Sequence, residues 1–312
     1  MSGIRRQFSM EKIIIICGPT GIGKTSFAIK LARRFNGEIV SADSMQIYRH
    51  MDIGTAKPDE EEQKLVSHHL IDFLDPGKNF DAAMYAKAAD RVIKEIFARG
   101  KTPFIAGGTG LYIKTLLHGL FRSEPICEKT LSKLNRELEE KGRLYLYQKL
   151  EECDPESAKA LHPNDSFRVI RALEFFLTNR QKISDYKKKH SFHETRYDFI
   201  KIGLYMEREK LYERINKRVD IMLSQGLLKE VATLVENGYS LDLKPMQSIG
   251  YKHMGMFIKN EVEWEEAVRL LKRDTRRYAK RQFTWFNKDR EINWVKPSQF
   301  EETKNLIKDF LT

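Results

Sequence analysis

The sequence predicts an α/β fold in which a P-loop-type parallel sheet is flanked by helices and carries an inserted all-helical subdomain. In the first part of the chain, short β-branched runs alternate with longer helical segments, the order that produces a parallel sheet. A glycine-rich loop of the phosphate-binding type joins the first run to the first helix. The predicted organisation is a first part of the α/β core at residues 1–124, a helical insertion at 125–197, and the rest of the core with basic C-terminal helices at 198–312.

The predicted elements are, in chain order, a strand at 12–18, a helix at 23–37, a strand at 38–44, a helix at 80–100, a strand at 102–110 and a strand at 199–206. Each strand is a short apolar run that ends in glycine or polar residues, as buried parallel strands do. Asn36-Gly37 ends the first helix, Asp81 is the N-cap of the second, and Gly100 stops it. From residue 208 to the end the chain is predicted to be mainly helical.

Composition and charge indicate a globular protein with a polyanionic partner. A hydrophobic content of 41% indicates a globular chain, and no run approaches the roughly 18 apolar residues of a membrane span. No apolar segment follows the basic N-terminus, so we expect no signal peptide. Cys17, Cys127 and Cys153 form no CxxC pair, which argues against a zinc site or disulfides and favours the cytoplasm. The net charge of 55 − 44 = +11 indicates a polyanionic partner, nucleic acid before anionic membrane.

Residues 18–25, GPTGIGKT, match the pattern G-x-x-x-x-G-K-[ST] of ATP-binding and other nucleotide-binding proteins, with a strand before and a helix after. Gly21 and Gly23 let backbone N–H groups close round phosphate oxygens, Lys24 supplies a positive charge, and the Thr25 hydroxyl can reach Mg²⁺. The alternative is a chance glycine turn. The loop is therefore predicted to bind a diphosphate or a triphosphate.

The partner motif of a nucleotide hydrolase or kinase is missing. Such enzymes place an acidic residue after a neighbouring strand to help hold Mg²⁺, but the strand at 102–110 leads into Gly107, Gly108 and Thr109. The acidic strand end is SADSMQIY, where Asp43 falls at the carboxyl edge of the sheet, which faces the ligand crevice. Asp43 is therefore placed to act on a second substrate, unless it is only a turn or capping residue.

Eight motifs occur together and in order: GPTGIGKT, SADSMQIYRHMDIGTAKP, HHLID, AGGTGLY, HPNDSFRVIRALE, RVDIMLSQGLLKEV, SIGYKHM and TRRYAKRQFTWF. From residue 12 to residue 295 this set resembles the tRNA dimethylallyltransferase family, also called tRNA isopentenyltransferase. The family transfers a dimethylallyl group to the exocyclic N6 amine of the adenosine 3′-adjacent to the anticodon in certain tRNAs and releases diphosphate. The resemblance implies that the loop holds dimethylallyl diphosphate rather than ATP, which would also explain the missing acid.

The resemblance also assigns roles to residues. It implies that Asp43 is the base, and that Lys24, Arg218 and Mg²⁺ bound through Thr25 meet the charge that develops on the leaving diphosphate. Mg²⁺ is the implied cofactor. The donor diphosphate would be bound by the whole loop, which comprises Gly18, Pro19, Thr20, Gly21, Ile22, Gly23, Lys24 and Thr25.

Helical periodicity nominates Arg218 independently. Leu211, Ile215, Val219 and Met222 form an apolar stripe, and Arg218 falls on that stripe, roughly 20° from Leu211 at about 100° per residue. A guanidinium directed towards a core needs a partner, because unpaired burial is costly. A diphosphate is a suitable partner, and a structural ion pair with a carboxylate is the alternative.

The target adenine must be flipped out of the anticodon loop to reach the site. By resemblance, the residues that contact tRNA form two segments: Asp43, Ser44, Met45 and Gln46, and then Phe167, Arg168, Val169, Ile170 and Arg171 of the helical insertion. One common form of the second motif has glutamine where this chain has Phe167, which could stack on a base instead. Thr109 is a further candidate for the phosphates or the tRNA. The alternative for Arg168, Arg171 and Glu174 is a solvated charged face.

Residues 269–290 contain nine Lys or Arg and two Asp. On a helix, one half of the circumference carries the basic residues Arg269, Lys272, Arg273, Arg276, Arg277, Lys280 and Arg281, and the other half carries Leu271, Thr275, Tyr278 and Ala279. A one-sided basic stripe beside aromatic residues suits a phosphate backbone, and a solvated helix is the alternative. Arg277, Lys280 and Arg281 are the tRNA-binding candidates.

Three other functions stay open beside the main hypothesis of a monomeric, Mg²⁺-dependent tRNA prenyltransferase whose partners are dimethylallyl diphosphate and the anticodon stem-loop of tRNA. They are prenylation of free AMP, ADP or ATP, phosphoryl transfer by a P-loop nucleotide kinase, and RNA binding by an ATPase-like switch. His68 and His69 are expected to be structural, because adjacent residues of a strand point to opposite faces.

Overall fold

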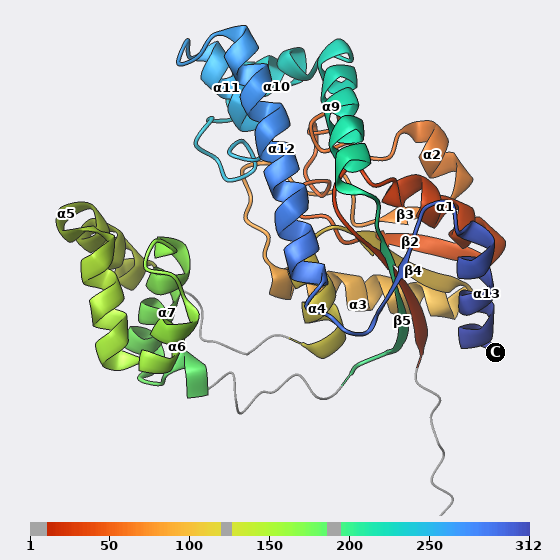
Figure 1. Cartoon of the computed structure of the whole chain (residues 1–312), viewed down its shortest axis with the longest axis horizontal. Helices are drawn as coiled ribbons and strands as arrows, with labels where there is room; N and C mark the ends of the chain where they lie inside the picture. Colours follow the sequence, from red (N-terminus) through yellow and green to blue (C-terminus); the bar gives the residue numbers. More distant parts are fainter. Residues whose placement is uncertain (1–10, 120–126, 186–194) are drawn as a thin grey trace, which may run out of the picture. The chain divides into compact units, whose positions relative to one another are not determined.

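The computed structural model describes residues 11–119, 127–185 and 195–312 (Figure 1). The chain divides into two compact units, Met1–Gly119 with Thr195–Thr312, called here the core unit, and Leu120–Glu194, called the helical unit. The insertion predicted at 125–197 overlaps the helical unit. Within the described ranges, no helix combines the length and the apolar character needed to cross a bilayer.

The core unit contains one parallel sheet in the order β3-β2-β4-β1-β5-β6. Its strands are β1 (Lys12–Cys17), β2 (Gly37–Ser41), β3 (His68–His69), β4 (Thr102–Gly107), β5 (Asp198–Leu204) and β6 (Ile292–Val295). The predicted α/β fold is confirmed, and the four predicted strands correspond to β1, β2, β4 and β5. The two edge strands, β3 and β6, were not predicted, because neither contains an apolar run long enough to signal a strand.

Helices cover both faces of the sheet, as predicted (Figure 1). The covering helices are α1 (Lys24–Arg34), α3 (Ala82–Ala98), α4 (Gly110–His118) and α13 (Phe300–Leu311). Successive side chains of β1 alternate between two separate cores. Ile14 and Ile16 pack with buried residues of α1 and α13, whereas Ile13 and Ile15 pack with those of α3 and α4. All four isoleucines are fully buried.

The predicted helix ends have the expected capping structures. The Asp81 carboxylate accepts hydrogen bonds from the N–H groups of Ala83 at 2.9 Å and Met84 at 2.8 Å, and so caps α3. Gly100 follows that helix with a φ of +67°, the left-handed conformation that favours glycine after a helix. The first helix, α1, ends just before Asn36, also at positive φ.

The remaining helices of the core unit are α2 (Glu60–Leu65), α9 (Arg208–Ser224), α10 (Leu227–Glu236), α11 (Tyr251–Ile258) and α12 (Trp264–Phe286). The region after residue 208 is mainly helical, as predicted. The helices α9 and α12 lie against each other, and Arg276 of α12 donates to the Asn216 side chain of α9 at 2.7 Å. These two helices form one side of the pocket described below, and the carboxyl edge of the sheet forms the other.

The described helices of the helical unit are α5 (Glu128–Cys153), α6 (Pro155–Ala160) and α7 (Ser166–Asn179), with a further turn near Ser184. This unit has its own hydrophobic core, to which Leu134, Leu146 and Leu150 of α5 and Val169 and Leu173 of α7 contribute. Gly142, at a φ of +80°, breaks α5 into two parts.

The Asp154 carboxylate connects two segments of the helical unit by hydrogen bonds. Its fully buried carboxylate accepts the N–H and hydroxyl groups of Ser157, at 3.1 and 2.6 Å, and those of Ser184, at 3.1 and 2.6 Å. Burial by itself raises the pKa of Asp154, but these hydrogen bonds outweigh it and hold the pKa below the ordinary range.

We expect Asp154→Ala to destabilise the helical unit by about 3 kcal/mol, because four buried donors lose their charged acceptor. Thermal unfolding followed by circular dichroism, with limited proteolysis to locate the change, measures this effect. Since the pKa of Asp154 is lowered in the folded state, its contribution is present above the unfolded pKa and is lost as the pH falls through the folded value. An unchanged melting profile would contradict the prediction.

Candidate active site

The glycine-rich loop, Gly18–Thr25, connects β1 to α1 at the carboxyl edge of the sheet. Gly21 has a φ of +80°, and a Cβ there would lie 2.8 Å from Cγ1 of Ile215 on α9, so a side chain would be both strained and crowded. Gly23, at a φ of +98°, directly precedes α1. The loop is therefore held closely against α9 and opens onto the start of a helix, where backbone N–H groups favour an anion.

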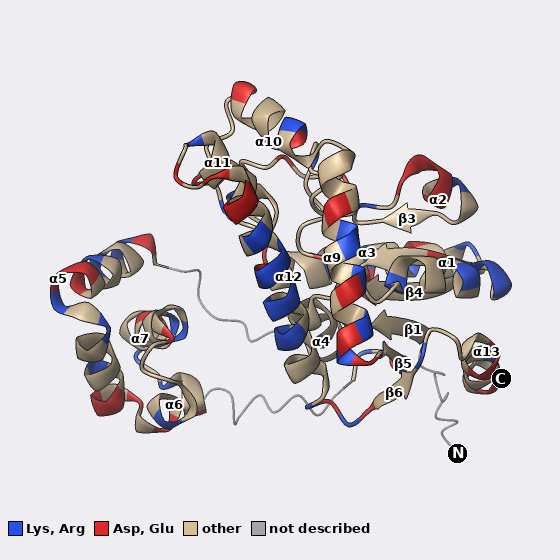
Figure 2. Cartoon of the chain, turned by 45° about the horizontal axis from the view of Figure 1, so that its top comes forward, with Lys and Arg blue, Asp and Glu red and all other residues tan. Residues whose placement is uncertain are grey.

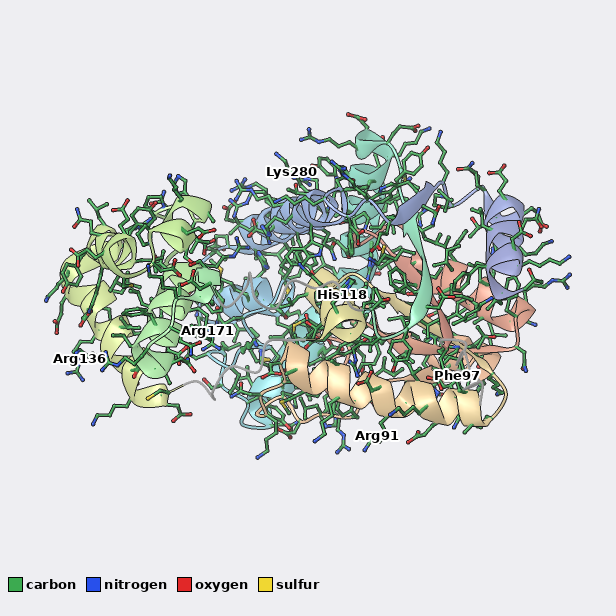
Figure 3. All side chains as sticks on the ribbon, turned by 90° about the horizontal axis from the view of Figure 1, so that it is seen from below. Arg91, Phe97, His118, Arg136, Arg171 and Lys280 are labelled. Carbon is green, nitrogen blue, oxygen red and sulfur yellow. The ribbon has the colours of Figure 1, made fainter. Side chains whose placement is uncertain are left out.

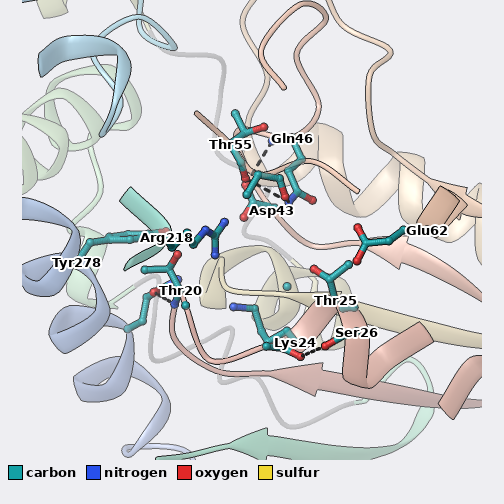
Figure 4. A pocket seen from close by; sticks show the side chains of 16 residues that line it. Thr20, Lys24, Thr25, Ser26, Asp43, Gln46, Thr55, Glu62, Arg218 and Tyr278 are labelled. Carbon is teal, nitrogen blue, oxygen red and sulfur yellow. Dashed lines mark hydrogen bonds between the residues drawn. The ribbon is translucent and has the colours of Figure 1, made fainter. Parts of the chain in front are cut away.

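A polar pocket lies between this loop, the end of β2 and the helices α9 and α12 (Figure 4). Its lining comprises Thr20, Gly21, Gly23, Lys24, Thr25, Ser26, Asp43, Gln46, Thr55, Ala56, Glu62, Ala106, Gly107, Arg218, Tyr278 and Gln282. The four residues predicted to be catalytic, Lys24, Thr25, Asp43 and Arg218, all line it. Segments more than 190 residues apart in sequence thus meet at the edge where parallel α/β sheets bind ligands.

Asp43 is a turn residue and also lines the pocket; its action on a second substrate stays a prediction. Its Oδ1 accepts the N–H groups of Met45 at 2.8 Å and Gln46 at 3.3 Å, which makes a side-chain turn at the end of β2. The residue also lines the pocket, where its carboxylate faces Arg218 and Lys24 (Figure 4). One oxygen is thereby held by the backbone, and the other is left for a substrate.

Lys24 lies at the base of the pocket and donates to the Pro19 carbonyl at 2.8 Å. Burial lowers the pKa of Lys24 to about 8, Asp43 opposes this shift, and Arg218 adds to it. The ammonium is therefore poised to lose its charge at mildly alkaline pH. A bound diphosphate would favour the charged form.

We expect the affinity for a diphosphate ester to decrease above about pH 8, because the pKa of Lys24 is about 8 and only its protonated form attracts the anion. The ester itself is fully ionised in that range, so its own charge does not change. Titration calorimetry with dimethylallyl thiolodiphosphate, an unreactive analogue, measures the dependence. Lys24→Met is the control, since it should bind weakly and show no such decrease; the same decrease in that variant would assign it to another group.

Arg218 of α9 extends into the same pocket (Figure 4). Leu211, Ile215 and Val219 are buried as the periodicity predicts, and Arg218 lies beside them. Burial lowers the pKa of Arg218, Asp43 opposes the shift, and Arg214 adds to it. Throughout the described part of the chain, no carboxylate lies within 4 Å of the Arg218 guanidinium, so the structural ion pair considered as an alternative is absent there.

Thr25 lies in the first turn of α1 and lines the pocket. Glu62 of α2 lies across from Thr25 (Figure 4). Among the described residues, no three acidic, His or Cys side chains form a metal-binding group. The oxygen donors present fit Mg²⁺ in the manner of phosphate sites, in which one or two protein oxygens join phosphate oxygens and water.

Burial raises the pKa of Glu62, although the N–H of Asp59 opposes that shift. Its Oε2 accepts that N–H at 3.3 Å, and Asp59 in turn accepts the Glu62 N–H at 2.8 Å. This capping box fixes α2 beside the pocket. Glu62 was not nominated from the sequence, although the spacing D-x-x-E is a signal of such a cap.

Residues 43–46 and Thr109, predicted to contact tRNA, hold one another in place. The Ser44 N–H donates to the Thr109 hydroxyl at 3.1 Å. The Gln46 amide accepts from Ser41 at 3.2 Å and donates to the carbonyl of Ala56 at 3.0 Å, so both of its ends are engaged within the protein. Asp43 and Gln46 line the pocket, whereas Ser44, Met45 and Thr109 do not. Contact of these residues with tRNA stays a prediction.

Three residues of the loop lie outside the pocket lining: Gly18, Pro19 and Ile22. Ile22 is fully buried in the core. A Cβ on Gly18 would lie 2.9 Å from the Leu204 carbonyl oxygen of β5. These residues shape the loop, and the prediction that they touch the diphosphate is untested.

The predicted tRNA-contacting segment of the helical unit forms the first half of α7. Phe167 is 82% exposed, and Arg168 is also exposed. Val169 and Ile170 are buried in the core of the unit, so their side chains are not available to a ligand. Arg171 pairs with Glu174, which is itself buried, so the alternative of a uniformly solvated charged face does not hold for Glu174.

The basic stripe of α12 is plainly visible in Figure 2. Five of its members have partners within the protein: Arg269 with Glu266, Lys272 with Asp220, Arg273 and Arg277 with Asp274, and Arg276 with Asn216. Arg277, Lys280 and Arg281 are exposed, and Lys280 is labelled on α12 in Figure 3. The three residues nominated for tRNA are therefore the accessible end of the stripe.

Two further lining residues, Tyr278 and Gln282, come from α12 and were not nominated. Tyr278 lies beside Arg218 (Figure 4), and its pKa is raised by burial and by Asp43. Gln282 is only 6% exposed. A polar residue between Ala279 and Phe286 on the apolar half of the helix is the signal that could have identified Gln282.

Fold and site together define an open parallel α/β protein with a polar pocket at the carboxyl edge of its sheet, in which the cations Lys24 and Arg218 suit a phosphorylated substrate and which also contains the carboxylates of Asp43 and Glu62. The family model described as IPP transferase matches residues 46–289. The chain belongs to this IPP transferase family and is a transferase, as the sequence motifs indicated.

Individual relatives agree over nearly the whole chain. A tRNA dimethylallyltransferase of Desulfosudis oleivorans is 49% identical over 301 residues, which cover 96% of either chain, and one of Acetivibrio thermocellus has the same identity and coverage. The solved full-length tRNA isopentenylpyrophosphate transferase of Bacillus halodurans is 41% identical with a TM-score of 0.72, over 96% of this chain and 97% of that one. A eukaryotic dimethylallyltransferase acting on tRNA is 30% identical with a TM-score of 0.82, over 96% and 79%.

Proposed function

We propose that this chain transfers the dimethylallyl group from dimethylallyl diphosphate to the N6 amine of the adenosine 3′-adjacent to the anticodon in certain tRNAs, with release of diphosphate. The observation that carries the proposal is the meeting of Lys24 and Arg218 with the single pocket aspartate, Asp43. Cations suit a leaving diphosphate, and a carboxylate suits the proton of an attacking amine.

In this reaction the N6 nitrogen forms a bond to the allylic carbon as that carbon loses its bond to the diphosphate oxygen. The free oxygen of Asp43 accepts the proton that leaves the amine. Lys24 and Arg218 stabilise the charge that moves onto the diphosphate. The Thr25 hydroxyl, with Glu62 nearby, would hold Mg²⁺, which neutralises charge on the diphosphate when bound.

The accessible cations of α12, Arg277, Lys280 and Arg281, support a large polyanion rather than a mononucleotide as the acceptor. On this proposal the anticodon stem-loop lies against that end of α12, and the target base is flipped into the pocket. We further propose that the enzyme works as a monomer, in the cytoplasm where tRNA is modified.

The test is mass analysis of nucleosides after incubation of unmodified tRNA with the protein, Mg²⁺ and dimethylallyl diphosphate, with AMP in a parallel reaction. The expected result is a dimethylallyl mass gain on adenosine of tRNA and none on AMP. Prenylated AMP alone would move the chain to the mononucleotide enzymes. Modification of neither, together with ATP turnover, would favour an ordinary nucleotide site.

A further inference from the structure

Gln282 connects three parts of the core unit through one side chain. Its Oε1 accepts the N–H of Thr20 in the glycine-rich loop at 2.8 Å, and its Nε2 donates to the Gly108 carbonyl in the turn after β4 at 2.9 Å. The residue itself belongs to α12 and is buried. A single amide thus bridges the loop after β1 and the turn after the adjacent strand.

The surroundings leave this amide one orientation. A donor lies on one side and an acceptor on the other, so exchanging the amide oxygen and nitrogen would break both hydrogen bonds. A Cβ on Gly108 would lie 2.3 Å from Nε2 of Gln282. The amide therefore fits only because residue 108 has no side chain, which gives a physical reason for a glycine at this position.

Within the part of the chain that the structure describes, the loop has no second hydrogen bond of this kind. Across the three described ranges, Gln282 is the one side chain from outside residues 18–26 that hydrogen-bonds to the loop backbone. The N–H groups of residues 21–25 donate to no acceptor within the same ranges. With the Thr20 N–H occupied by Gln282, these following N–H groups are the ones available to phosphate oxygens.

We propose that Gln282 is a positioning residue of the donor site, which fixes the Thr20 peptide and so holds the loop in the conformation that receives the diphosphate. The inference rests on the proposed function, in which that loop binds dimethylallyl diphosphate. The accessible cations Arg277, Lys280 and Arg281, one to five residues before Gln282, lie on the outer side of the same helix. The helix therefore serves both substrates through opposite faces.

Two substitutions test this role, one in Gln282 itself and one in the glycine that its amide contacts. Gln282→Met keeps the length of the side chain but removes both hydrogen bonds. Gly108→Ala leaves Gln282 in the sequence and places a methyl group where Nε2 now lies. Because the atom it meets is the end of a flexible side chain, the amide moves while the turn persists. Phe283→Leu is the matched control, since Phe283 adjoins Gln282 on α12 but packs against Trp294.

The affinity for dimethylallyl thiolodiphosphate is measured by calorimetry, the affinity for unmodified tRNA by filter binding, and the melting temperature by circular dichroism. We expect Gln282→Met to bind the analogue about ten-fold more weakly, the effect of one unsatisfied buried donor. Gly108→Ala should also weaken binding of the analogue. The double variant should bind the analogue no more weakly than Gln282→Met alone, since both substitutions disrupt the same interaction. The affinity for tRNA should stay unchanged.

The outcomes separate the inference from the function on which it rests. If the wild-type protein does not bind the analogue, the donor assignment itself is overturned. If the wild type binds and both variants bind equally well, only the role of Gln282 is overturned. A loss in Phe283→Leu that matches the loss in Gln282→Met at equal melting temperature would also overturn it, because general loosening of α12 would then explain the effect.

Discussion

Asp43→Asn should reduce dimethylallyl transfer by about 10²- to 10⁴-fold, the contribution of a positioned general base. The asparagine keeps an oxygen that can accept the N–H groups of Met45 and Gln46, so the turn at the end of β2 should survive. The affinity for tRNA should therefore stay close to that of the wild type. Single-turnover transfer with tRNA, together with a tRNA binding assay, measures the two effects separately.

Asp43→Ala is the control for the turn, since it removes the hydrogen-bond acceptor as well as the base. Asp43 also raises the pKa of Lys24, so its removal lowers that pKa below about 8. The comparison should therefore be made at or below neutral pH, where Lys24 stays charged in both proteins. Wild-type turnover by Asp43→Asn would exclude Asp43 as the base.

Arg218→Ala should slow transfer by about 10²- to 10³-fold, as does the loss of one group that stabilises transition-state charge. Donor binding should weaken as well, because the guanidinium faces the pocket that contains Lys24. Arg218 lowers the pKa of Lys24, so removing it should raise that pKa, and the alkaline decrease in donor affinity should move to higher pH. Transfer kinetics and donor titrations at several pH values measure these effects.

The melting temperature distinguishes this role from a structural one. No carboxylate in the described residues pairs with Arg218, and its burial without a partner is unfavourable, so Arg218→Ala should melt at the same temperature or higher. Arg218→Lys should recover part of the activity, because it restores a charge without the planar fork. Unchanged kinetics combined with a lower melting temperature would place Arg218 in a structural role.

The sequence predicted the basic half of α12 but not which of its seven cations are accessible to a ligand. In the fold, Lys272 and Arg276 face partners on α9, which leaves Arg277, Lys280 and Arg281 accessible. The partners of Lys272 and Arg276 lie on a helix that is distant in sequence, so the sequence alone could not identify them.

Local patterns determined much of the fold and part of the site. The β-branched runs predicted the four inner strands of the sheet, and Asp81 and Gly100 predicted the ends of α3. The strand–loop–helix pattern predicted the loop that contains Lys24 and Thr25. These features depend on residues adjacent in the chain, whose conformation follows from sterics and local hydrogen bonds. Asp43 was nominated by its place at a strand end and Arg218 by helical periodicity, and the family resemblance assigned their roles.

Only the tertiary structure decided the features that depend on packing between distant segments. The short edge strands β3 and β6 form because a neighbouring strand offers hydrogen bonds, without any local signal. The Gln46 amide hydrogen-bonds to Ser41 and Ala56, and Tyr278, placed on the apolar half of α12, borders the pocket. The sequence by itself determined the class of protein and nominated Lys24, Asp43 and Arg218 for its site. The tertiary structure decided which cations of α12 are accessible and which polar side chain, Gln282, hydrogen-bonds to the loop, because burial and hydrogen-bond partners arise only when segments far apart in the chain come together.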